Sequence, residues 1–182
     1  MKQDTATVNQ LFKEGLNFAK TKSIKKDNSY FLKFKIREIY FKIRQGKLTS
    51  KEGLLEFQSI YNAIKTSDKY DIITELVGRI SLLYRNRKEL GKALNYNTLE
   101  IEYAQKSNNA KEVASAKITE LDLSYQLIPR PIKSEDVLPL IKKAKEAEVY
   151  MHKNEILDIL PFAQLYLAKF YIHETNYKKG ED

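Results

Sequence analysis

The side chains that most often carry catalysis or bind metals are scarce in this sequence. It contains no Cys, which excludes disulfides, thiolate zinc sites and a Cys nucleophile. The two imidazoles, His152 and His173, are twenty-one residues apart, a spacing that fits no helical metal-binding pair. We therefore expect neither catalytic residues nor a metal site.

Neither paired carboxylates nor phosphate-binding loops indicate an active site in this sequence. Glu100 and Glu102, like Glu146 and Glu148, are two residues apart, and such residues do not face each other on a helix. The six Gly form no Gly-x-x-x-x-Gly-Lys-Ser/Thr, Gly-x-Gly-x-x-Gly or Gly-x-Ser-x-Gly pattern. We expect no cofactor and no enzymatic activity, although an active site built from ordinary residues would leave no such pattern.

Basic and aromatic residues gather near the N-terminus. Residues 1–50 hold twelve Lys/Arg and four Asp/Glu, whereas residues 51–182 hold twenty of each. The densest cluster combines Phe31, Phe34, Tyr40 and Phe41 with Lys33, Lys35, Arg37 and Lys42. Aromatic side chains among cations can stack bases and contact phosphates, so nucleic-acid binding through this region is one hypothesis. The other is a solvated Lys-rich helix face whose aromatic residues pack inside.

Helices must position all of these residues. Apolar side chains recur at helical spacing between short polar clusters, as at Leu54, Phe57, Ile60 and Ile64. Thr49-Ser50-Lys51-Glu52 has the pattern of a capping box. We predict no strand, and helices near residues 6–21, 29–45, 50–66, 70–88, 90–106, 110–127, 135–151 and 155–174. Pro161 predicts a kink or a late start in the last helix.

The chain also repeats itself. Residues 65–84, 106–125 and 152–171 align without gaps, at offsets of 41 and 46 residues. Each window ends in a tyrosine that follows an aliphatic residue by four positions, and an earlier pair fits too: Ile36 and Tyr40, Ile80 and Tyr84, Leu121 and Tyr125, Leu167 and Tyr171. A period of about 40 with two helices per unit indicates stacked helical hairpins that complete one another's cores.

These features resemble the tetratricopeptide repeat family over roughly residues 29–182. The family has a large aliphatic, a small residue and a tyrosine in the first helix of each unit, and an alanine nine residues further on. The match is best at Ile80, Ser81, Tyr84 and Ala93, and it recurs at Leu167, Ala168, Tyr171, Tyr177 and Gly180. Arg37 and Asp122 depart from the small residue, and the family's closing proline is absent.

The resemblance implies one all-α domain over residues 1–182. About eight helices would form antiparallel hairpins stacked as a right-handed α-solenoid. Asn176-Tyr177-Lys178-Lys179 looks like the turn into a second helix that has no body, so we expect a fragment of a longer protein. No stretch approaches the roughly 18 uncharged apolar residues of a membrane span, and no apolar signal core follows Met1. We expect a cytoplasmic chain as given, with an exported or membrane-anchored parent left open.

The function implied by the resemblance is protein or peptide binding, as in a sensory or scaffold module of a bacterial signalling or regulatory protein. The partner would lie in a concave groove lined by the first helices. Groove positions, carried over residue by residue, are Phe34, Glu38, Phe41, Leu82, Arg85, Asn86, Thr119, Leu123, Gln126, Leu165, Lys169, Ile172 and His173. The alternative is a basic helical scaffold that binds nucleic acid through its N-terminal face.

Overall fold

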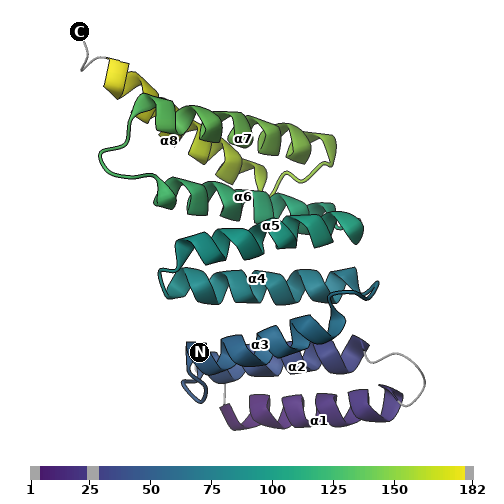
Figure 1. Ribbon diagram of the computed structural model, residues 1–182. Helices are drawn as coiled ribbons and strands as arrows, with labels where there is room; N and C mark the ends of the chain where they lie inside the picture. Colours follow the sequence, from purple (N-terminus) through teal and green to yellow (C-terminus); the bar gives the residue numbers. More distant parts are fainter. Residues whose placement is uncertain (1–4, 24–28, 179–182) are drawn as a thin grey trace. The chain divides into compact units, whose positions relative to one another are not determined.

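The computed structural model describes residues 5–23 and 29–178, and within these ranges every regular element is an α-helix (Figure 1). The eight helices are α1 (Thr5–Ser23), α2 (Ser29–Arg44), α3 (Ser50–Ile64), α4 (Tyr70–Asn86), α5 (Leu90–Lys106), α6 (Ala110–Leu127), α7 (Ser134–Lys153) and α8 (Leu160–Lys178). The all-α prediction is confirmed, and so is the existence of each predicted helix. None of the described helices is both long and apolar enough to cross a membrane.

The last helix differs from the prediction at both ends. It begins at Leu160 and not at residue 155, so the late start predicted from Pro161 is confirmed. Pro161 is the second residue of α8, where the missing N–H leaves no helical hydrogen bond unmade. The predicted turn at Asn176 is wrong, because α8 continues through Lys178. Residues 179–182, including Gly180, lie outside the described residues.

The chain divides into two compact units, residues 1–80 and residues 81–182, with the boundary inside α4. In the first unit, α2, α3 and the start of α4 enclose a core that includes Ile36, Ile39, Phe57 and Leu76, none of which is exposed. The entry into α3 is fixed by the predicted capping box. The Glu52 amide donates to Thr49 Oγ1 at 3.2 Å, and the Thr49 amide donates to Glu52 Oε2 at 2.8 Å.

α1 lies against α2 through aromatic residues and one glycine. The rings of Phe12 and Phe41 are 5.2 Å apart. A Cβ at Gly15 would lie 2.5 Å from Cε1 of Phe34, so only glycine allows the two helices to approach this closely. α1 therefore packs on the side of α2 that carries Phe34 and Phe41.

The second unit contains α5, α6, α7 and α8 together with the last residues of α4. One cluster of its core joins α6, α7 and α8: Leu121, Tyr125, Val137, Leu140, Ile141, Ala144, Leu167 and Phe170. A second cluster of Ala114, Ala147, Met151, Ile156 and Ala163 continues it toward the other end of the same helices. Alanines at these contacts let the helix axes approach closely.

The repeated residues occupy related but not identical surroundings. Ile36, Ile80, Leu121 and Leu167 are all buried, as are Tyr84 and Tyr125, whereas Tyr171 is 39% exposed. A cation lies over each of the four tyrosine rings. The distances to the ring centroids are 4.3 Å for Arg79 over Tyr40, 5.4 Å for Lys92 over Tyr84, 3.7 Å for Lys169 over Tyr125 and 5.5 Å for Lys145 over Tyr171.

Two phenylalanines of α8 test the core of the second unit. Phe170 is fully buried between α6 and α7, whereas Phe162 is 54% exposed on the same helix. Phe170→Ala should lower the free energy of unfolding by about 3–5 kcal/mol, because it leaves a cavity. The matched control Phe162→Ala should cost less than about 1 kcal/mol. Urea denaturation followed by circular dichroism measures both, and equal losses would contradict this packing of α8.

Candidate partner-binding face

The three predicted groove residues of the first unit lie at the contact between α2 and α1. Phe34 and Phe41 pack on α1, beside Gly15 and Phe12 respectively. Glu38 lies at the edge of the same contact, where it lines a hollow between α1 and α2 together with Lys13 and Lys47. This contact between α1 and α2 was not predicted, because the resemblance to the repeat family begins at residue 29 and does not include α1.

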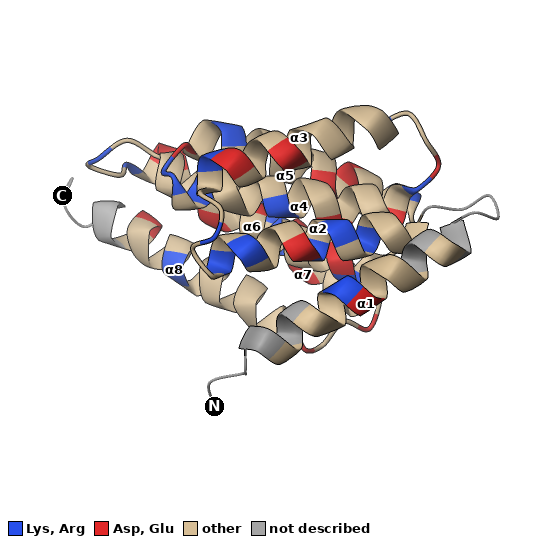
Figure 2. Cartoon of the chain, turned by 90° about the horizontal axis from the view of Figure 1, so that it is seen from below, with Lys and Arg blue, Asp and Glu red and all other residues tan. Residues whose placement is uncertain are grey.

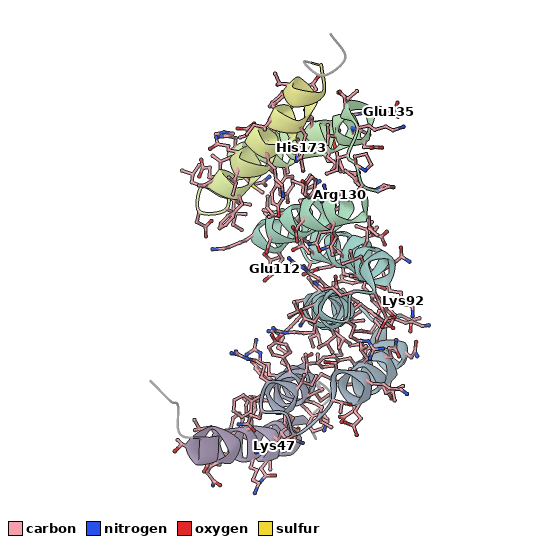
Figure 3. The ribbon with its side chains drawn as sticks, turned by 90° about the vertical axis from the view of Figure 1, so that its left-hand side faces the viewer. Lys47, Lys92, Glu112, Arg130, Glu135 and His173 are labelled. Atoms are coloured by element: carbon pink, nitrogen blue, oxygen red, sulfur yellow. The ribbon has the colours of Figure 1, made fainter. Side chains whose placement is uncertain are left out.

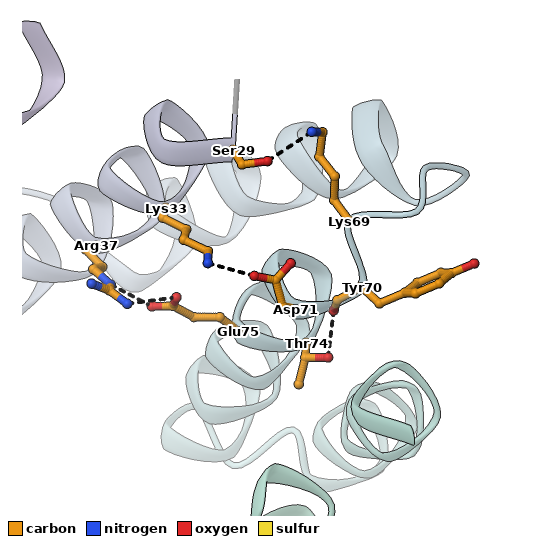
Figure 4. Close-up of polar contacts among 8 residues, drawn as sticks. All are labelled: Ser29, Lys33, Arg37, Lys69, Tyr70, Asp71, Thr74 and Glu75. Atoms are coloured by element: carbon orange, nitrogen blue, oxygen red, sulfur yellow. Dashed lines mark hydrogen bonds and ion pairs between the residues drawn. The ribbon is translucent and has the colours of Figure 1, made fainter. Parts of the chain in front are cut away.

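The basic residues of the N-terminal cluster are engaged in ion pairs. Figure 4 shows the pairs between α2 and α4, in which Lys33 Nζ lies 2.7 Å from Asp71 Oδ2 and Arg37 Nε lies 3.2 Å from Glu75 Oε1. Burial acts to raise the pKa of Asp71, but the hydrogen bond and charge of Lys33 outweigh it and hold that pKa below its ordinary value.

The other two cations of the cluster lie beside Glu38. Lys42 Nζ is 2.8 Å and Lys35 Nζ 3.4 Å from the Glu38 carboxylate, and together they lower its pKa against the opposing effect of burial. Glu38 is the one acidic residue of α2, and Figure 2 shows that the helix is otherwise marked by basic positions. The four cations that suggested phosphate binding thus each have a carboxylate partner.

In the second unit, Asp122 organises a polar cluster from three helices. Its carboxylate lies 2.5 Å from Arg85 Nη2 in the last turn of α4 and accepts a 2.8 Å hydrogen bond from Gln126 Nε2 in α6. The Tyr166 hydroxyl of α8 lies near the same carboxylate. Burial of the phenol, followed by its interaction with the Asp122 carboxylate, raises the pKa of Tyr166 to about 12.

Next to this cluster, Tyr125 connects α6 with α8. Its hydroxyl lies 2.9 Å from His173 Nε2, and its ring centroid lies 5.7 Å from that of Phe170. Lys169 Nζ lies 3.7 Å and the Arg130 guanidinium 5.1 Å from the ring centroid. His173 and Arg130, both labelled in Figure 3, come from α8 and from the loop after α6. Cations over a tyrosine face gain from the negative potential of the ring.

The remaining predicted groove positions differ in accessibility. Leu123 has no exposed surface, so it belongs to the core and cannot contact a partner. The half-buried Thr119 donates its hydroxyl to the Ser115 carbonyl at 3.2 Å, Leu82 is half-buried, and Asn86 is exposed at the end of α4. Leu165 and Ile172 of α8 are 65% and 59% exposed.

Four of the predicted residues are therefore brought together in the second unit by two residues that the groove prediction did not include, Asp122 and Tyr125. We name this surface the Asp122 face and define it as Arg85, Asp122, Gln126, Tyr166, Lys169 and His173, with Leu165 and Ile172 as its exposed apolar neighbours. Asp122 had a sequence signal, since it replaces the small residue of the repeat. A carboxylate at that position attracts the arginine, amide and phenol around it.

The part of the chain that the structure describes contains no group of three or more His, Asp or Glu side chains placed to hold a metal ion. His152 is exposed at the end of α7, and His173 lies within hydrogen-bonding distance of the Tyr125 hydroxyl. Comparison with protein-family models, with curated proteins and with solved structures finds no match to this chain.

The Tyr166–Asp122 contact has a measurable pH signature. Because the pKa of Tyr166 is raised from 10.0 to about 12, its contribution to stability is complete below about pH 10 and is lost as pH rises through about 12. Asp122→Asn should shift the Tyr166 titration toward lower pH by removing the neighbouring charge. Site-resolved NMR of ¹³Cζ-labelled tyrosine, assigned with Tyr166→Phe, measures this. An unchanged titration in Asp122→Asn would contradict the contact.

Proposed function

We propose that this chain is a non-catalytic, tetratricopeptide-like repeat scaffold that binds a protein or peptide on the Asp122 face. One observation carries the proposal. Charged and hydrogen-bonding side chains from α4, α6 and α8 are held in place by one another, directly beside the exposed Leu165 and Ile172. Preordered polar groups next to accessible apolar side chains give a partner both orientation and binding energy.

The right-handed stacking of hairpins implied by the resemblance is part of the same proposal. It is supported by α6, which contacts its own hairpin partner α7 and also α8, the first helix of the next hairpin. Contacts of this kind are typical of solenoids, in which each unit completes the core of the one before. A role as a sensory or scaffold module of a bacterial signalling or regulatory protein is the biological setting we propose.

The chemistry of the face indicates what a partner should carry. Arg85 and Gln126 both bond to the Asp122 carboxylate, whereas Lys169 places an ammonium over the Tyr125 ring. Leu165 and Ile172 lie seven residues apart on α8, about two helical turns. We therefore propose an amphipathic segment that places two apolar side chains on Leu165 and Ile172, and a carboxylate or carbonyl near Lys169.

Substitutions on this face test the proposal once a partner is isolated by affinity capture with the full chain and identified. Arg85→Glu, Lys169→Glu and Leu165→Glu should each weaken the measured affinity at least about fivefold, because they remove a contact or introduce a repelling charge. Lys142→Glu, on the exposed surface of α7, is the matched control and should leave the affinity unchanged. Thermal melts show whether each variant folds. If folded Lys169→Glu and Leu165→Glu both bind like the wild type, the Asp122 face is not the binding site.

Nucleic-acid binding is the alternative from the sequence, and the ion pairs of Lys33, Lys35, Arg37 and Lys42 count against it. We expect no retention on heparin and no oligonucleotide binding at moderate salt. Fluorescence anisotropy with a labelled oligonucleotide over a salt series measures this. Binding that falls steeply as salt rises would mean phosphate contacts and would favour the alternative.

A further inference from the structure

A hollow with an excess of positive charge lies between α1 and α2 in the first unit. Its volume is about 340 Å³. It is lined by two aromatic rings, three ammonium groups and one carboxylate: Phe12, Lys13, Glu38, Phe41, Lys42 and Lys47. Phe12 and Lys13 belong to α1, and Lys47, labelled in Figure 3, to the loop after α2. Small-molecule sites in proteins begin at about 300 Å³, so the hollow suits a ligand of about a dozen non-hydrogen atoms.

The carboxylate of the hollow already has cations beside it. Lys42 Nζ lies 2.8 Å from Glu38 Oε1, and Lys35 Nζ lies 3.4 Å from Glu38 Oε2. By contrast, no carboxylate of the described residues lies within ion-pairing distance of Lys13 or Lys47. The hollow therefore contains two ammonium groups whose charge no described carboxylate balances.

The basic excess of the sequence lies in the same unit as the hollow. Residues 1–80 hold sixteen Lys/Arg and nine Asp/Glu, whereas residues 81–182 hold sixteen and fifteen. Ion pairs balance the cations of the N-terminal cluster on α2, but they do not involve Lys13 or Lys47. Cations that line a concave surface with apolar walls raise the local concentration of anions. Charge complementarity thus indicates an anionic ligand for the hollow.

The two rings give such a ligand an apolar wall. The ring centroids of Phe12 and Phe41 lie 5.2 Å apart with planes at 41°, and both side chains are half-buried. A third aromatic ring can pack on this tilted pair edge-to-face or offset. The lining favours a carboxylate over a phosphate as the charged group, because Glu38 repels a second negative charge and the lining residues include no Arg.

We propose that this hollow binds a small aromatic carboxylate, whose ring packs on Phe12 and Phe41 and whose carboxylate is bound by Lys13 and Lys47. A ligand of this size makes few contacts, so we expect a dissociation constant on the order of 0.1–1 mM. The proposal is independent of the partner-binding function, because the hollow belongs to the first unit and the Asp122 face to the second.

An NMR titration of the full chain with 2-naphthoate tests the site. The amide signals of Lys13 and Lys47 should shift and saturate, and the shifts give the dissociation constant. Lys13→Gln and Lys47→Gln should each raise this constant at least about threefold, because each removes one of the two ammonium groups that bind the carboxylate. Glu38→Gln should lower it about threefold, because it removes the repelling charge from the hollow. A variant that merely loosened the fold would not bind more tightly.

Two controls separate this site from general attraction of anions. Lys51→Gln removes the same charge at an exposed position of α3 and should leave the dissociation constant unchanged. 2-Naphthylmethanol keeps the rings without the charge and should bind at least about fivefold more weakly. Thermal melts show whether each variant folds. Three results would each overturn the proposal. They are no saturable shift up to about 5 mM 2-naphthoate, equal affinity for 2-naphthylmethanol, and an equal loss of affinity in Lys51→Gln and in the folded Lys13→Gln and Lys47→Gln variants.

Discussion

The packing of α6 against both α7 and α8 is the interaction on which the second unit depends. A helix such as α6 has an apolar surface too wide for its sequence neighbour to cover. Leu121 meets α7, whereas Tyr125 on the next turn reaches Phe170 and His173 of α8. Burial of an aromatic side chain stabilises the folded state by about 2–3 kcal/mol. Without α8, α6 would therefore lose a large part of the core around Tyr125. The polar surface proposed as a binding site exists because of the same contact.

Polar pairs add selectivity to this apolar packing. Lys33 and Asp71, and likewise Arg37 and Glu75, connect α2 with α4, while Arg85 and Asp122 connect the end of α4 with α6. These pairs are partly exposed, and such pairs contribute at most about 1 kcal/mol each. Their role is to favour one neighbour and one register, since a shifted helix would place like charges together or leave a carboxylate alone. The fold is thus stabilised by apolar burial, and its pairing is specified by charge.

The helices were predictable because each depends on local sequence. Helical spacing of apolar residues, the capping box at Thr49 and the proline at residue 161 all act within a few residues of the element they define. The candidate site was predictable only in part. Arg85, Gln126, Lys169 and His173 were named from the repeat. The two residues that hold them, Asp122 and Tyr125, were noted only as an exception to the repeat and as one of its tyrosines.

The assignment of Leu123 failed for a physical reason, which is the rotation of α6 about its own axis. Leu123 was assigned to the groove and is buried, while the adjacent Asp122 takes the surface position. Neighbouring residues on a helix differ in direction by about 100°, so a small rotation exchanges a surface residue for a core residue. The contact of Phe34 and Phe41 with α1 was not predicted, because α1 lies outside the repeat and Gly15 lets it approach them closely.

The most direct test of the contact between α6 and α8 is the set of NMR distances around Tyr125. Nuclear Overhauser effects from its ring protons to the rings of Phe170 and His173 should be strong, because the ring centroids lie 5.7 Å apart in both cases. Selective aromatic labelling of the full chain resolves these signals. Strong effects to both rings are the result expected if α8 packs on α6. Effects from α8 to α7 alone, with none to Tyr125, would show that α8 does not pack on α6 and would contradict the account.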